Sequence, residues 1–160
     1  MNSRPALENQ TVEEVASLLL PLEDRLLLLP TVTVAEMVPF RQPEPEADTP
    51  DWYLGAFSWR EQPVPLLSFE VLNGEARPNP NSRSRVAVLN HTGVSEKLPF
   101  IAIPTLGIPR LARVNPDEIS VVETADKKPF ELMHVSIAGE TAVIPDVSAM
   151  EQAYMDFRRG

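Results

Sequence analysis

The side chains best suited to acid–base or metal chemistry are two histidines, His91 and His134, and the 23 acidic residues. Neither histidine has a second ligand at a metal-site spacing or belongs to a local nucleophile signature. The carboxylates gather in short runs such as "EPEAD" at 44–48, which solvation explains without catalysis. No two glycines lie close enough to form a phosphate-binding loop. The sequence therefore predicts a protein that is not an enzyme and that holds no metal, nucleotide or other cofactor.

A different kind of chemistry is suggested by "LGAFSWREQPVPLL" at residues 54–67, where two apolar runs flank a polar corner. Trp59 and Arg60 stand at this corner, and Trp and Arg are enriched among the residues that dominate binding energy in protein interfaces. In one interpretation the corner docks a partner, with Trp59 as an apolar anchor beside an exposed Arg60. In the other, Trp59 folds back on its own domain while Arg60 keeps the turn solvated.

Charge and composition narrow the possible partners. The chain has 14 basic and 23 acidic residues and a formal net charge of −9. Binding to nucleic acid without sequence preference needs many clustered Lys and Arg side chains, so we expect no nucleic-acid partner. The absence of cysteine excludes disulfides and fits a reducing compartment. The longest aliphatic runs are far shorter than the roughly 20 residues that cross a bilayer, which predicts a soluble, cytoplasmic protein with no direct membrane insertion.

Seventeen prolines spread along the chain favour many short strands over long helices. Aliphatic runs broken by "LEDR" at 22–25 and by Pro30 predict a hairpin followed by a third strand. Apolar and polar residues alternate over 31–36, which indicates strand and places Val34 and Glu36 on one face of it. The acidic, proline-rich segment 41–50 is expected to be an exposed connection.

The next strand-like runs, "YLGAFS" at 53–58 and "VPLLSFEVL" at 64–72, predict a second hairpin whose loop is residues 59–62. The polar tract 73–85 is expected to be a long crossing loop. Met150, Tyr154 and Phe157 have the spacing of a short closing helix. Further strand-like runs occupy 86–90, 97–103, 106–114, 131–137 and 141–147.

The chain also contains a weak internal echo. "LLPTVTVAEM" at 28–37 resembles "AIPTLGIPRL" at 102–111, with Pro-Thr-apolar-x-apolar in common. Such self-similarity favours two similar small β-barrels.

Three segments, taken in order and spacing, resemble the CheW family of chemosensory adaptors. Val34 and Glu36 match a Val-x-Glu strand, and residues 143–147 match a closing Val-Ile-x-Asp-Val strand before a terminal helix. The central segment matches a Gly-x-x-x-apolar-Arg hairpin that leads into a Val-Pro-aliphatic-aliphatic strand, through Gly55, Trp59, Arg60, Val64, Pro65, Leu66 and Leu67.

Three positions depart from the family pattern. Glu61 stands where the family usually has glycine, Ser68 replaces a common aspartate, and Pro104 lies in a strand where an aspartate is usual. With these departures, the sequence resembles the CheW-like adaptors of type IV pilus systems, ChpC or PilI in kind, more than the flagellar adaptor.

The resemblance implies an all-β fold of two interleaved, five-stranded SH3-like barrels with a short C-terminal helix. The expected organisation is a flexible N-terminus at 1–13 and a CheW-like domain at 14–160. Its first barrel would lie mainly in 14–76 and its second mainly in 84–148, with the chain crossing between them.

The resemblance also implies an adaptor that couples the cytoplasmic tips of methyl-accepting receptors to a CheA-type histidine kinase. Such a protein would act in chemotaxis or in twitching motility, and it would be recruited to receptor arrays at the membrane. On this basis the expected partner-binding residues are Val34, Glu36, Trp59 and Arg60. Two other classes stay open, a β-barrel regulatory module that binds a small ligand or peptide and a hydrolase with a dispersed site.

Overall fold

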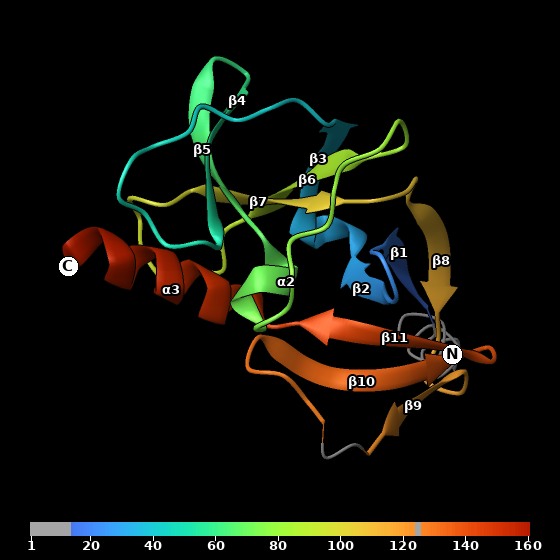
Figure 1. Cartoon of the computed structure of the whole chain (residues 1–160). Helices are drawn as coiled ribbons and strands as arrows, with labels where there is room; N and C mark the ends of the chain where they lie inside the picture. The colour runs from blue at the N-terminus through green and yellow to red at the C-terminus, as the bar shows by residue number, and fades with distance from the viewer. Residues whose placement is uncertain (1–13, 124–125) are drawn as a thin grey trace, which may run out of the picture.

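The computed structural model describes residues 14–123 and 126–160, which form two β-sheets and a C-terminal helix (Figure 1). The segment 1–13, expected to be flexible, lies outside the described residues. One sheet has six strands in the order β8-β1-β2-β11-β10-β9, and the other has five in the order β3-β6-β7-β5-β4. The strands are β1 (Val15–Pro21), β2 (Leu26–Pro30), β3 (Val34–Pro39), β4 (Tyr53–Trp59), β5 (Gln62–Leu67), β6 (Arg85–Asn90), β7 (Phe100–Thr105), β8 (Arg110–Val114), β9 (Ile119–Val122), β10 (Glu131–Ile137) and β11 (Glu140–Pro145).

The all-β, CheW-like fold with a short terminal helix is confirmed, although one sheet has six strands where five were expected. The leucine-rich runs of the first hairpin have a simple role. Leu19 and Leu28 face a small core within the six-stranded sheet, while Leu20 and Leu27 face the core between the sheets. Both faces of β1 and β2 are therefore buried, which explains why these strands read as continuous aliphatic runs rather than alternating ones.

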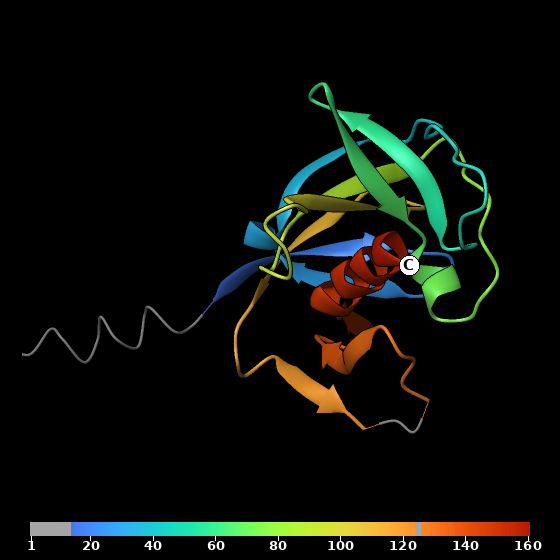
Figure 2. The same cartoon turned by 90° about the vertical axis from the view of Figure 1, so that its left-hand side faces the viewer.

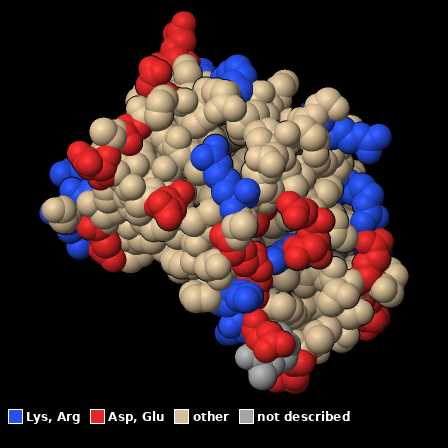
Figure 3. Space-filling model, viewed as in Figure 1, with Lys and Arg blue, Asp and Glu red and all other residues tan. Residues whose placement is uncertain are grey.

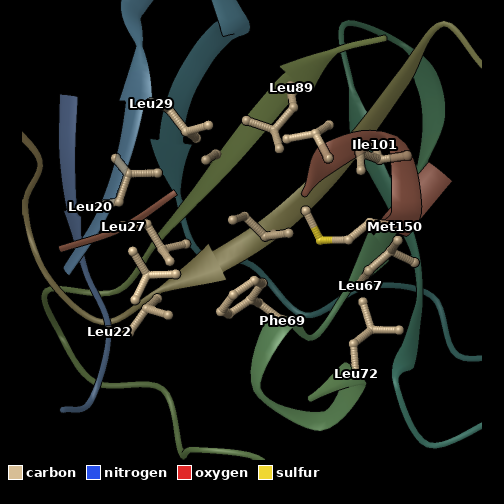
Figure 4. Close-up of a cluster of buried hydrophobic side chains, with 14 of the residues drawn as sticks. Leu20, Leu22, Leu27, Leu29, Leu67, Phe69, Leu72, Leu89, Ile101 and Met150 are labelled. Carbon is tan, nitrogen blue, oxygen red and sulfur yellow. The ribbon is translucent and has the colours of Figure 1, made fainter. Parts of the chain in front are cut away.

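The largest hydrophobic cluster lies between the two sheets (Figure 4). Leu20, Leu27 and Leu29 reach it from the six-stranded sheet, and Leu89 and Ile101 reach it from the five-stranded one. A second cluster fills the inside of the barrel that the five-stranded sheet forms, and a third fills the inside of the barrel that the six-stranded sheet forms. The molecule is thus two small barrels joined by a shared apolar layer.

The chain does not divide between the sheets at the expected boundary. Residues 14–76 supply β1 and β2 to the six-stranded sheet but β3, β4 and β5 to the five-stranded one. The chain changes sheet between β2 and β3 and changes back between β7 and β8. Both crossings lie inside the echoed segments 28–37 and 102–111. The two similar segments are therefore the places where the chain passes from one sheet to the other. They do not each belong to a separate, successive barrel.

Several elements differ locally from the sequence prediction. Residues Thr31–Thr33 form a 3-10 turn, η1, because the chain crosses between sheets there, so the predicted strand begins only at Val34. The predicted run 64–72 ends as a strand at Leu67, and the helix α2 (Phe69–Leu72) follows. The Ser68 hydroxyl accepts a hydrogen bond from the Val71 amide and caps this helix. Strand β9 was not predicted.

The predicted closing helix is confirmed as α3 (Val147–Arg159). It follows β11 of the six-stranded sheet but packs against the five-stranded sheet (Figure 2). The Asp146 carboxylate accepts a hydrogen bond from the Ala149 amide and caps its start. Glu151, fully buried, accepts hydrogen bonds from the amide and hydroxyl of Thr92. Near its end, Arg158 makes a bidentate pair with Glu46. The helix therefore holds the two barrels together.

The acidic segment 41–50 is not merely an exposed connection. Glu44 and Ala56 exchange two backbone hydrogen bonds, of 2.8 and 3.0 Å, so the segment covers the outer edge of β4. Gly55 allows this close approach. Its φ is +129°, and a Cβ atom at this position would lie 2.3 Å from the Glu44 carbonyl oxygen. Only glycine combines that backbone conformation with that space.

A buried polar cluster also ties the sheets together. Arg25, in the turn between β1 and β2, donates hydrogen bonds to Glu131 at 3.2 Å and to Glu75 at 2.5 Å. The Glu131 side chain is 2% exposed and also contacts His134 Nε2 at 2.7 Å. His134 is thus a partly buried residue of strand β10. Because Glu75 follows α2 and Glu131 begins β10, Arg25 links the end of the five-stranded sheet to the six-stranded sheet.

Candidate partner-binding site

The β4–β5 hairpin rises from the five-stranded sheet at the top of Figure 1. Its loop has two residues, because Trp59 already pairs with Gln62 in the ladder. Arg60 and Glu61 have φ values of 51° and 64°, and two successive left-handed residues make the turn that matches strand twist in tight hairpins. The turn therefore presents both side chains at the end of a well-defined ladder.

Trp59 folds back onto its own barrel. It is 6% exposed, belongs to the core cluster of the five-stranded sheet, and packs edge-on against Phe100 with ring centroids 4.8 Å apart. Its indole Nε1 donates a hydrogen bond of 2.9 Å to Glu36 Oε1. The prediction of Trp59 as an apolar anchor for a partner is therefore wrong for this structure, because a buried ring offers almost no surface.

Glu36 and Arg60 complete the arrangement, which we call the hairpin corner (Glu36, Trp59 and Arg60). Arg60 Nη2 lies 3.2 Å from the same Glu36 oxygen that accepts the indole hydrogen bond, and the guanidinium lies 4.8 Å from the centre of the Trp59 ring. The Arg60 side chain is 67% exposed and that of Glu36 is 41% exposed. The corner joins β3 to β4, the two edge strands of the five-stranded sheet, and so helps to close that barrel.

Val34 does not share a face with Glu36 as the alternation predicted. The register of β3 against β6 shifts between these two residues, since Val34 pairs with Leu89 and Glu36 with the adjacent Val88. Such a bulge places one extra residue in the strand and reverses the expected facing. Val34 consequently packs against the core between the sheets while Glu36 reaches the hairpin corner.

Sequence reasoning missed two neighbours of the corner. Phe100 supports Trp59 from β7, and Arg41 donates a hydrogen bond to the Ser58 carbonyl while its guanidinium lies 4.6 Å from the centre of the Phe57 ring. No local pattern links these residues. Their proximity follows from barrel closure alone.

A second exposed feature lies on and beside the six-stranded sheet. Val15, Val32 and Leu111 are 54%, 82% and 66% exposed, which is unusual for aliphatic side chains. Leu111 in β8 pairs with Leu18 in β1, Val15 begins β1, and Val32 lies in η1, which contacts β1. Val15 pairs with Val114, three positions from the Leu18–Leu111 pair, so Val15 and Leu111 lie on opposite faces of the sheet and do not form one surface. All three residues belong to other elements than the hairpin corner.

The described residues contain no group of three His, Cys, Asp or Glu side chains arranged to hold a metal ion. A cleft of about 370 Å³ lies beside the Arg25 cluster, but its Arg25, Glu131 and His134 are already bonded to one another. No helix in the described part of the chain is long and apolar enough to span a membrane. Figure 3 shows basic and acidic side chains interspersed over the face of Figure 1, without a broad basic patch.

Two barrels that share an apolar layer, with exposed features on each, define a β-barrel scaffold. The chain belongs to the CheW-like domain family, whose sequence profile matches residues 16–153. Its structure is similar to the crystal structure of the scaffolding protein CheW from Thermoanaerobacter tengcongensis, with a TM-score of 0.70 and 13% sequence identity. That similarity covers 82% of this chain and 88% of the other. A search of curated proteins found no match.

Proposed function

We propose that this protein is a chemotaxis-type adaptor that couples the cytoplasmic tips of methyl-accepting receptors to a CheA-type histidine kinase. The observation that carries the proposal is the family match over 16–153, together with the convergence of Glu36, Trp59 and Arg60 at one corner. The protein catalyses no reaction and works by holding two partners. It acts in the cytoplasm and is recruited to receptor arrays.

An adaptor needs separate surfaces for its two partners. The hairpin corner lies on the five-stranded sheet, and the exposed Leu111 lies on β8 at an edge of the six-stranded one. In the corner, Arg60 supplies the exposed charge, and Glu36 and Trp59 hold its guanidinium in place from two directions. A fixed arginine gives a charge-assisted contact at a smaller entropy cost than a mobile one. Val34 supports the corner from the core side of the same strand.

Replacing Arg60 with glutamate is expected to weaken binding to the receptor tip or to the kinase regulatory domain by at least about tenfold, or 1.4 kcal/mol. The change places a third carboxylate beside Glu36 and Glu61 and reverses the charge offered to the partner. Isothermal titration against each purified partner measures this effect. A melting curve on the same preparation should change little, because an exposed ion pair contributes about 1 kcal/mol or less.

Arg159→Glu is the matched control for this experiment. The Arg159 side chain is 68% exposed, so it makes the same change of charge at equal exposure on the far end of α3. It should bind both partners as the unmodified protein does. Equal affinity of the Arg60→Glu and Arg159→Glu proteins for both partners would remove the hairpin corner from the interface.

The exposed Leu111 gives a complementary prediction. Leu111→Glu should reduce binding of the partner that Arg60→Glu leaves intact, by about tenfold, because it places a charge where apolar area would be buried. The protein should stay folded since Leu111 is 66% exposed. Loss of the same partner in both variants would show a single surface and contradict a bridging role.

We infer a narrower role in twitching motility from the departures at Glu61, Ser68 and Pro104, which are similar to those of type IV pilus adaptors. The test is a pull-down with the chemosensory kinases and receptors of the source organism. Retention of a pilus-associated kinase over a flagellar one supports this branch. Retention of the flagellar kinase alone overturns it and leaves the adaptor role intact.

A further inference from the structure

A small recess lies at the end of the five-stranded sheet opposite the hairpin corner. Strands β3, β5 and β7 end there, and β4 and β6 begin there. The recess is partly open to solvent, and its volume of about 20 Å³ is room for about one water molecule. Apolar side chains, prolines among them, form most of its wall. Four polar residues that are 6% exposed or less line it too, and they are Ser68, Glu70, Ser84 and Thr105.

The Glu70 carboxyl group has an incomplete set of partners. Besides its own backbone amide, the described chain offers it only the Ser68 hydroxyl, at 3.5 Å, which is the outer limit of a hydrogen bond. Arg25 acts on Glu70 through its charge, but its guanidinium is already paired with three other carboxylates. Arg77 lies on the wall of the recess and is exposed. Burial raises the pKa of Glu70 above its ordinary value of 4.5, which agrees with a site that lacks a cation.

Two hydroxyl groups in the recess can accept further hydrogen bonds. Ser84 Oγ accepts one from the Asn81 amide at 2.8 Å, and the Thr105 hydroxyl donates one to the Gly107 carbonyl at 3.3 Å. A hydroxyl oxygen has two lone pairs, so each of these oxygens keeps at least one for another donor. Together with the Glu70 carboxylate, they give the recess three acceptor groups beside a space of about one water molecule.

The volume and the acceptors of the recess select one class of ligand. A primary ammonium group is compact, carries one positive charge and has three N–H donors, which equals the number of acceptor groups. The planar guanidinium of an arginine such as Arg77 is too large for a space of this volume. The apolar wall suits the methylene stem that carries the ammonium group in lysine or in a small amine. A water molecule would fit the volume but supplies no counter-charge to a buried carboxylate.

We propose that this recess is a binding site for a primary alkylammonium group, with Glu70 as the counter-ion and Ser84 and Thr105 as further hydrogen-bond acceptors. The ammonium group lies at the Glu70 carboxylate, and its stem leaves through the open side along the apolar wall. A Glu70 carboxyl group that is neutral before binding releases its proton to water. The ammonium group belongs either to a free amine or to a lysine side chain of another protein. The site is separate from the hairpin corner, which lies at the other end of the same sheet.

The test is an NMR titration of the purified full chain with n-butylammonium chloride. Saturable shifts are expected in the amide signals of Ser84 and Thr105, together with a shift of the Glu70 carboxyl carbon toward its ionised position. Tetramethylammonium chloride has the same charge without N–H donors, and 1-butanol has the same stem without the charge, so neither should produce these shifts. Glu70→Gln should weaken binding by at least about tenfold, because it removes the counter-charge. Glu118→Gln, which removes an exposed carboxylate in the turn before β9, should bind as the unmodified protein does.

Equal shifts with 1-butanol or with tetramethylammonium would overturn the proposal, as would unchanged affinity in Glu70→Gln. If Glu70→Gln fails to fold, the Glu70 carboxyl carbon of the unmodified protein decides the question, and a signal that n-butylammonium does not move refutes the site.

A second titration, with Nα-acetyl-lysine methylamide, separates the two sources of the ammonium group. Binding at least as tight as that of n-butylammonium assigns the site to a lysine side chain of another protein. Weaker binding assigns it to a small free amine, because the bulk of a peptide backbone is then excluded. Neither kinase nor receptor is present in these titrations, so every result leaves the adaptor proposal untouched.

Discussion

Gly55→Ala is expected to lower the free energy of unfolding by at least about 3 kcal/mol. The added Cβ would lie 2.3 Å from the Glu44 carbonyl oxygen and 2.9 Å from its carbon. Both are backbone atoms of Glu44, whose amide and carbonyl groups exchange hydrogen bonds with Ala56, so they cannot move aside without breaking the edge pairing of β4. The φ of +129° adds a conformational cost that alanine cannot avoid. Urea unfolding followed by tryptophan fluorescence measures the loss.

Gly74→Ala separates the two causes. Gly74 has a φ of +84°, but a Cβ there would meet no atom within 4 Å. Its substitution therefore carries conformational strain without a clash and should cost only about 1 kcal/mol. If the two variants lose equal stability, the close approach of the 41–50 segment to β4 does not exist in solution.

Arg25→Met should cost about 3 kcal/mol of stability, because it leaves Glu131 and Glu75 without their counter-charge. The Arg25 and Glu131 side chains are only 16% and 2% exposed, so solvent cannot replace the lost pairing. The methionine keeps most of the packed stem of the arginine and isolates the charge. Adding Glu131→Gln to this variant should recover at least about 1 kcal/mol, since the stranded charge is then removed. Urea unfolding at pH 7 measures both steps.

Arg110→Met is the exposed counterpart. Arg110 and Glu140 are 2.7 Å apart but their side chains are 55% and 48% exposed, so breaking this pair should cost less than about 1 kcal/mol. Similar losses for Arg25→Met and Arg110→Met would show that the Arg25 cluster is open to solvent and does not tie the sheets together.

Local patterns predicted most of the strands and the closing helix, because these depend on residues close in sequence. The Leu-rich hairpin, the Trp59 to Gln62 turn and the spacing of Met150, Tyr154 and Phe157 all carry such signals. The alternation over 31–36 gave a wrong start for the strand and a wrong facing for Val34. The chain passes between the sheets at 31–33 and a bulge follows at 34–36, and neither feature has a signature in the local sequence. Strand β9 was missed because its four residues follow a polar turn and are poorly buried.

The candidate site was predicted in part. The resemblance to CheW proteins selected Glu36, Trp59 and Arg60, and the structure brings these three together at one carboxylate oxygen. It could not show that Trp59 points inward, because burial of that ring depends on Phe100, which is distant in sequence. Residue type alone does not separate a tryptophan at an interface from one in a core.

The exchange of strands between the sheets has a consequence for how this protein is made. During synthesis, every strand of the five-stranded sheet has left the ribosome once residue 105 has emerged. The six-stranded sheet, in contrast, needs β11, which ends at residue 145 and pairs in parallel with β2. Until β11 has emerged, the hairpin of β1 and β2 lacks one of its neighbouring strands, although both of its aliphatic faces are buried in the finished fold. Long-range closure of this kind is slow and leaves apolar strands open to aggregation, so the nascent chain is expected to depend on chaperones more than its small size suggests.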